Sequence, residues 1–261
     1  MIRKDAKGMS KKSWKAWFGR FVPKYIPNSL VAGAMGLLSV LHRTSKKQSE
    51  ANRVHNQEVL VEQVDTPQTK RFFKPGTFIE NQRQWADVRF GSAFTMAYGG
   101  CEIFAVYNAL VALGRELTGA DLAELIGQFE RKGAVWAGRL GVAPMAAYKY
   151  FRKQGYRVQR LSCRKEKKIN ALGEQYDTII VTAYNNGNDI FGRIHTVNIS
   201  KDEEGRFWGH NCYKQYWPEK GGPVFVSDGP HATLWEAIHS MGGGKAEPIC
   251  VIGIGKEKEA L

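Results

Sequence analysis

The spacing of apolar residues changes along the chain, from a helical pattern in its first half to an alternating pattern after residue 156. Residues 103–113 are apolar at nearly every position, which predicts a helix that is buried on almost all sides. This helix begins at Cys101 and ends near Gly114. Thr118 and Asp121 have the spacing of a capping box and predict a second helix, through residue 129.

A third helix is expected from Pro144 to Gln154, because proline is favoured in the first turn and Gly155 follows. Beyond it, short runs rich in β-branched and aromatic residues predict strands, with one helix at about 232–241 between the last two. The expected strands are residues 156–161, 178–184, 194–200, 206–210, 224–227 and 248–254.

Helices therefore come first and strands second, which favours an α+β fold. The strands at 194–200 and 206–210 are separated only by a short turn, and such a connection joins antiparallel neighbours. We predict that the buried helix beginning at Cys101 packs on an antiparallel β-sheet.

The first 75 residues are predicted to form a basic extension, and residues 76–261 the main domain. Within the extension, four aromatic residues have helical spacing among lysines and arginines, and Pro23 is expected to end this amphipathic segment. The apolar stretch 30–41 is too short to span a bilayer comfortably, and a secretory signal is not supported. Residues 44–70 are polar and predict a linker or an arm over the core. The four aromatic residues are Trp14, Trp17, Phe18 and Phe21.

The formal charge of +13 is concentrated in this extension, because residues 1–50 hold eleven Lys or Arg against Asp5 and Glu50. No nucleic-acid recognition motif accompanies the charge, so no specific nucleic-acid partner is predicted. Three alternative roles are open for residues 11–41: they could dock on the protein's own core, on an anionic membrane surface, or on a protein partner.

Four cysteines lie at scattered positions, without the paired spacing of a zinc site or of a disulfide framework. We expect a reducing, cytoplasmic location, with membrane association as an alternative. Neither a cofactor nor a metal is predicted.

The candidate chemistry begins at Gly99-Gly100-Cys101. A helix N-terminus carries partial positive charge and unpaired N–H groups, which favour a thiolate and offer donors to an oxyanion. His195 begins one predicted strand and Asn211 follows the next, so the two residues meet at the open end of a hairpin. Each residue alone has an ordinary structural explanation. The ordered set instead predicts a nucleophile (Cys101), a general base (His195) and the residue that orients it (Asn211).

Other polar residues are weaker candidates. His210 is expected to point to the opposite face of its strand from Asn211 and to be structural. Asp228 is interpreted as a turn residue, or as an alternative to Asn211. Cys163, Cys212 and Cys250 have no histidine arranged like His195.

These motifs resemble the papain-like cysteine peptidase superfamily, nearest to the bacterial group that includes the double-glycine leader peptidases. The resemblance covers about residues 92–255. It rests on Gly-Gly-Cys101 opening an apolar helix, on the Pro144 helix followed by Gly155-Tyr156-Arg157-Val158, and on His195 and Asn211 across a hairpin. It implies a papain-like fold and a thiol hydrolase that cleaves a peptide or isopeptide bond of a peptide or protein substrate.

The sequence departs from this family at the oxyanion hole, where a Gln usually stands five or six residues before the cysteine. Those positions hold Met96 and Thr95, and Gln82 and Gln84 are too distant in sequence to match the motif. Thr95 and a backbone N–H, such as that of Gly100, are the remaining candidate donors.

Two alternative functions follow. The same thioester chemistry could transfer an acyl group to an amine, or the domain could be a weakly catalytic or non-catalytic binding module. The extension could also cover the cleft as an inhibitory arm.

Overall fold

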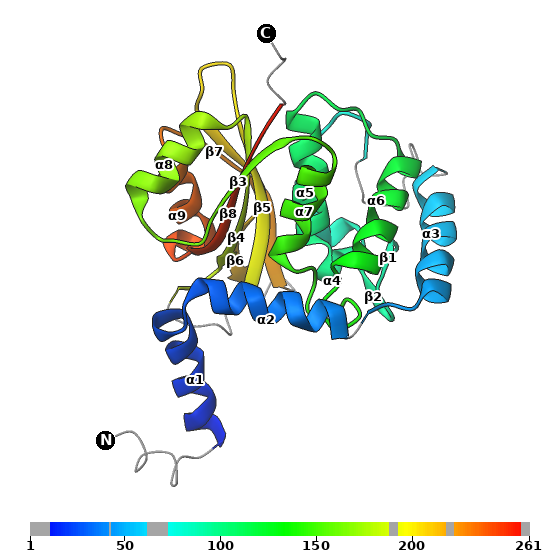
Figure 1. Cartoon of the computed structure of the whole chain (residues 1–261), viewed down its shortest axis with the longest axis horizontal. Coiled ribbons are helices and arrows are strands. Elements are labelled where there is room, and N and C mark those ends of the chain that lie inside the picture. Colours follow the sequence, from blue (N-terminus) through cyan, green and yellow to red (C-terminus); the bar gives the residue numbers. More distant parts are fainter. Residues whose placement is uncertain (1–10, 42, 62–72, 188–192, 218–221, 257–261) are drawn as a thin grey trace.

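A six-stranded antiparallel sheet lies at the centre of the computed structural model, which describes residues 11–41, 43–61, 73–187, 193–217 and 222–256 (Figure 1). The strand order is β3-β8-β4-β5-β6-β7, and neighbouring strands pair antiparallel throughout. The strands are β3 Arg157–Leu161, β4 Thr178–Tyr184, β5 Ile194–Lys201, β6 Phe207–Trp217, β7 Gly222–His231 and β8 Glu247–Gly255.

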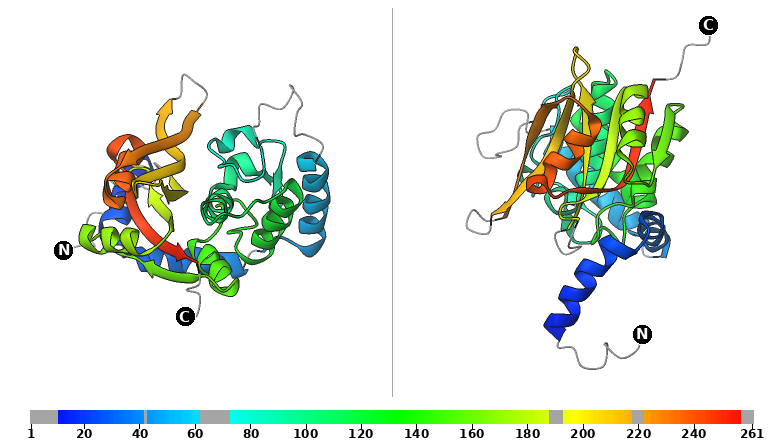
Figure 2. Two further views of the ribbon diagram at one scale, coloured as in Figure 1. Left: turned by 90° about the horizontal axis from the view of Figure 1, so that it is seen from above. Right: turned by 90° about the vertical axis from the view of Figure 1, so that its left-hand side faces the viewer.

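Helices cover both faces of this sheet, so that three layers enclose two apolar cores (Figure 2). Helix α5 packs on β5 and β4, and α6 and α7 lie on the same side. The opposite face carries α8 and α9, which share a core with Val181 and Val197. The helices of these layers are α5 Cys101–Ala112, α6 Gly119–Lys132, α7 Pro144–Lys153, α8 Glu166–Gln175 and α9 Leu234–Gly244.

This arrangement confirms the α+β class, the antiparallel sheet and the burial of the cysteine-bearing helix, in which residues 102–110 are all buried. The capping box predicted at Thr118 is present, with both reciprocal hydrogen bonds to Asp121. Strand β4 has the predicted bounds, and Pro144 is the first residue of α7.

Several boundaries were predicted wrongly. Helix α1, Lys11–Tyr25, continues two residues past Pro23. Strand β6 does not end before Asn211 but continues to Trp217, because a bulge at Asn211 shifts the register and the pairing with β7 resumes beyond it. Helix α8 was not predicted.

Short elements lead into the cysteine helix. They are the 3-10 helix η1 Gln82–Gln84, the two-stranded pair β1 Arg89–Phe90 and β2 Phe94–Thr95, and the single-turn helix α4 Met96–Gly99. Helix α4 runs into α5 with only Gly100 between them.

The described part of the extension packs against the main domain. Helix α2, Asn28–Leu41, contacts β8 and α7, while α3, Lys46–Val61, contacts α6 and β1. Part of the stretch interpreted as a polar linker or arm is therefore helix α3, and residues 62–72 lie outside the described residues. Leu60 belongs to the same core as α5. None of the helices described has the length and apolar character needed to cross a membrane.

Candidate functional site

Cys101 is the first residue of α5, as predicted, and Gly100 makes the junction with α4. A Cβ atom at Gly100 would lie 2.6 Å from both Cε and the carbonyl oxygen of Met96, so glycine is required there for space. The N–H of Gly100 donates to the Met96 carbonyl at 3.0 Å. This hydrogen bond uses the backbone donor that we had considered for the oxyanion hole.

Thr95 and Met96 stand where the superfamily usually has the glutamine of the oxyanion hole, and they differ in burial and in their ability to donate a hydrogen bond. Met96 is fully buried in the core. Thr95 is the N-cap residue of α4, is half-buried, and makes no capping hydrogen bond with its side chain. Its hydroxyl is therefore the better of the two as a candidate oxyanion donor.

The thiol of Cys101 lies against β5, where it meets the backbone and side chain of Thr196. Burial raises the pKa of Cys101 to about 11, and the hydrogen bonds with Thr196 offset this effect only in part. Desolvation thus opposes the effect of the helix N-terminus on the thiol, and the thiolate stays a prediction.

Glu102, the next residue, is fully buried, and its carboxyl oxygens make no hydrogen bond of ordinary geometry. Burial raises the pKa of Glu102 to about 8, despite nearby polar groups of Thr196 and Thr182. Sequence analysis did not single out Glu102, although it is an acid at the start of an otherwise apolar run. When ionised, it raises the pKa of Cys101 further.

His195 is the second residue of β5 and the strand neighbour of Thr196. Its Nε2 lies 2.7 Å from the backbone carbonyl oxygen of Asn211. A carbonyl can only accept, so Nε2 carries the proton and Nδ1 keeps a free lone pair in the neutral ring. Burial lowers the pKa of His195 to about 4, and its ring packs against Phe225 with centroids 5.0 Å apart.

The predicted meeting of His195 and Asn211 is thus confirmed, but through the main chain of Asn211. The side chain of Asn211 pairs with Gln82: its Oδ1 accepts from the Gln82 N–H, and its Nδ2 donates to Gln82 Oε1, both at 3.0 Å. The Cys101 thiol lies at Thr196, the strand neighbour of His195, but successive residues of a strand point to opposite faces of the sheet, so this contact does not by itself bring the thiol to the imidazole. The pairing of thiol and imidazole itself stays a prediction.

Residues 79–82 connect the helix and the hairpin that carry these groups. Gln82 donates from Nε2 to the carbonyl of Ala97 in α4. Glu80 accepts from the Asn211 N–H at 3.0 Å. Asn108, buried within α5, makes paired hydrogen bonds with the N–H and carbonyl of Ile79. This segment, which we call the strap, fixes α5 and β6 relative to one another.

His210 is buried, and both of its ring nitrogens are bonded, as expected for a structural residue. Its Nδ1 donates to Glu80 at 2.6 Å, so its Nε2 accepts from the hydroxyl of Ser200 at 2.8 Å. Phe78 stacks on the ring at 3.7 Å. Asp228 lies within β7 and not in a turn after the strand; it accepts from Ser240 and lies 3.4 Å from His231.

Within the described residues, no three His, Cys, Asp or Glu side chains are grouped so that they could hold a metal ion. No protein-family model matches the chain, and no curated protein or solved structure matches it either.

Proposed function

We propose that the protein is a papain-like thiol hydrolase that attacks the carbonyl of a peptide or isopeptide bond. The observation that supports this most is that Cys101 begins a buried helix packed on β5, the strand that carries His195. The hydrogen bond from Nε2 of His195 to the Asn211 carbonyl leaves Nδ1 of the neutral ring as a base.

In this proposal, the thiol proton passes to Nδ1 of His195 as sulfur bonds to the substrate carbonyl carbon. The pKa of His195 lies far below that of Cys101, so this transfer is uphill in the free protein and must accompany formation of the C–S bond. The imidazolium then gives its proton to the leaving amine. Water, deprotonated by Nδ1, hydrolyses the thioester and regenerates the thiol.

The oxyanion would be held by the N–H of Cys101, at the first position of the helix, and by the Thr95 hydroxyl. The Asn211 carbonyl stabilises the imidazolium through Nε2. In this site the orienting group is a main-chain carbonyl, where the superfamily usually relies on the side chain of Asn or Asp.

A peptide-library digestion tests the proposal. The wild-type chain and a Cys163→Ala control are expected to produce new peptide termini and, after acid quenching, an acyl adduct on Cys101. Cys101→Ala should abolish both, and His195→Ala should lower the rate at least about a hundredfold, the usual contribution of a general base. Cleavage that persists in Cys101→Ala would exclude the mechanism. Added amine separates hydrolysis from acyl transfer, because transfer yields the corresponding amide.

The raised pKa of Cys101 and the lowered pKa of His195 favour a second candidate, a papain-like module that binds peptides without cleaving them. Iodoacetamide distinguishes the two. A catalytic site should show Cys101 alkylation that falls when His195 is replaced by Ala. In a binding module, Cys101 alkylation should be independent of His195 and should increase only as pH rises toward about 11.

A further inference from the structure

Helix α2 exposes an apolar face. Its exposed large residues are highly accessible, at 62% for Leu30, 60% for Leu37 and 62% for Leu41. Between them, Gly33 and Ala34 continue the same exposed stripe. The buried positions are Asn28, Ala32 and Ser39. A helix whose outer face is meant for water carries polar side chains there, so this exposed apolar stripe indicates a surface that binds something else.

Helix α1 adds an aromatic row to this surface. Trp17 and Tyr25 are exposed, and Phe21 lies between them with ring centroids 4.8 Å and 5.0 Å from its two neighbours. The helix projects away from the body of the molecule (Figures 1 and 2). Tryptophan and tyrosine are the side chains that favour the boundary between water and lipid.

The flanks of both helices are positively charged. No Asp or Glu occurs between residues 6 and 49, whereas Arg20 and Lys24 are exposed on α1 and Arg43, Lys46 and Lys47 are exposed just after α2. An apolar stripe bordered by cations matches an anionic lipid surface. Two copies of this face would instead bring their cations together, which disfavours self-association.

We propose that the α1–α2 surface, formed by residues 17–41 with the flanking basic residues, binds the surface of anionic membranes. The anionic lipid headgroups pair with the lysine and arginine side chains, while the leucines and aromatic rings enter the boundary between the headgroups and the acyl chains. At 14 residues, α2 lies in the plane of the interface and does not span the bilayer. This inference is independent of the proposed hydrolase activity.

Co-sedimentation with vesicles tests the proposal, using phosphatidylcholine alone and an equimolar mixture of phosphatidylcholine and phosphatidylglycerol. The full chain should bind the mixed vesicles and not the neutral ones, and high salt should weaken binding. Leu30→Gln/Leu37→Gln should reduce binding by about tenfold or more. The matched control is Val54→Gln, an exposed apolar residue of α3, which should leave binding unchanged.

A second pair of variants tests the charge. Arg20→Gln/Lys24→Gln should reduce binding several-fold more than Lys132→Gln/Lys149→Gln, which removes the same charge from exposed positions on α6 and α7. Circular dichroism confirms that each variant is folded. Equal binding to neutral and anionic vesicles would overturn the proposal. So would dimerisation of the wild-type chain that the leucine variant abolishes, because the face would then belong to a second copy.

Discussion

Asn211 is held in a left-handed backbone conformation, with a φ of 59°. Asparagine tolerates this conformation better than most residues, because its short polar side chain can bond locally. The bulge turns its carbonyl to His195, while its N–H meets Glu80 and its side chain meets Gln82. One residue thus joins the candidate base to the strap.

We therefore predict that Asn211→Ala destabilises the protein by about 2–4 kcal/mol, from the left-handed backbone and the lost bonds to buried Gln82. Asn211→Gly keeps the backbone conformation and should cost about 1 kcal/mol less. Urea unfolding measures both. If the glycine variant were the less stable of the two, the backbone conformation would not be the deciding feature.

Glu102 gives a pH-dependent prediction. Its pKa is about 8 in the folded protein against 4.5 normally, so folding is favoured at low pH and this stability is lost as pH rises from 4.5 through 8. Glu102→Gln removes the charge and should be more stable than the wild type by about 3–5 kcal/mol above pH 8. Near pH 4 the two proteins should be nearly equal. Parallel stability profiles across this range would contradict burial of the carboxyl.

Among the elements, those with strong local signals were predicted from sequence. Helix α6 has its Thr118 capping box, and β4 is a run of seven buried residues. Helix α3 has few apolar positions and was interpreted as part of a linker or an arm over the core, because the residues that hold it in place are distant in sequence. Asn56 pairs with both backbone groups of Arg89, and Asn52 reaches Glu130. Such contacts leave no periodic pattern.

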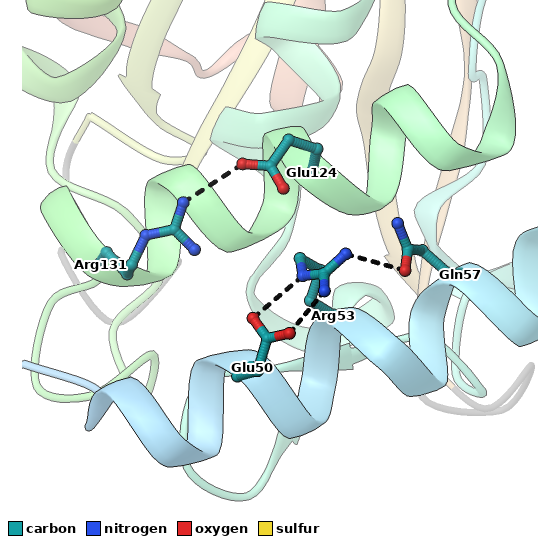
Figure 3. Close-up of polar contacts among 5 residues, drawn as sticks. All are labelled: Glu50, Arg53, Gln57, Glu124 and Arg131. Atoms are coloured by element: carbon teal, nitrogen blue, oxygen red, sulfur yellow. Dashed lines mark hydrogen bonds and ion pairs between the residues drawn. The ribbon is translucent and has the colours of Figure 1, made fainter.

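Figure 3 shows that the exposed charged side chains between α3 and α6 pair within each helix: Arg53 with Glu50 and Gln57 on α3, and Arg131 with Glu124 on α6. The bonds that Asn52 makes from α3 to other segments are buried. Asn52 donates to Glu130 Oε1 and to the carbonyl of Gly91. The buried amide, not the ion pairs, should therefore stabilise the interface.

Asn52→Ala is accordingly expected to destabilise the protein by about 1–3 kcal/mol, because a buried carboxyl and a buried carbonyl each lose one hydrogen bond. The neighbouring Arg53→Ala is the matched control and should leave the unfolding midpoint unchanged, since its ion pair is exposed to water. Thermal or urea denaturation of both variants compares them. A larger loss of stability for Arg53→Ala than for Asn52→Ala would show that the ion pair, and not the buried amide, stabilises the interface.

At the scale of the whole molecule, the candidate site joins three segments that are far apart in sequence. The helix start at Cys101 and the hairpin of His195 and Asn211 carry local signals and were predicted. Gln82 was set aside because of its distance from Cys101, yet it meets Asn211 across 129 residues. Glu80 and Gln82 have no motif of their own, so only the tertiary fold reveals the strap.

The extension should behave as part of the folded body and not as a removable inhibitory arm. A chain beginning at Phe73 would lose Leu60 from the core and the buried bonds of Asn52 and Asn56, together about 5 kcal/mol or more. That loss is comparable with the total stability of a typical domain, ~5–15 kcal/mol, so we expect no cooperative thermal transition.

A chain beginning at Lys46 retains α3 and is the matched comparison. It loses α1 and α2, including the bond from Asn28 to the Pro248 carbonyl, and should melt cooperatively at a lower temperature than the full chain. Near-ultraviolet circular dichroism follows both truncations. If the chain beginning at Phe73 melted as cooperatively as the full chain and its Cys101 were alkylated faster, the extension would be an inhibitory arm. Loss of the transition in that chain alone would instead show that α3 is needed to complete the core around the cysteine helix.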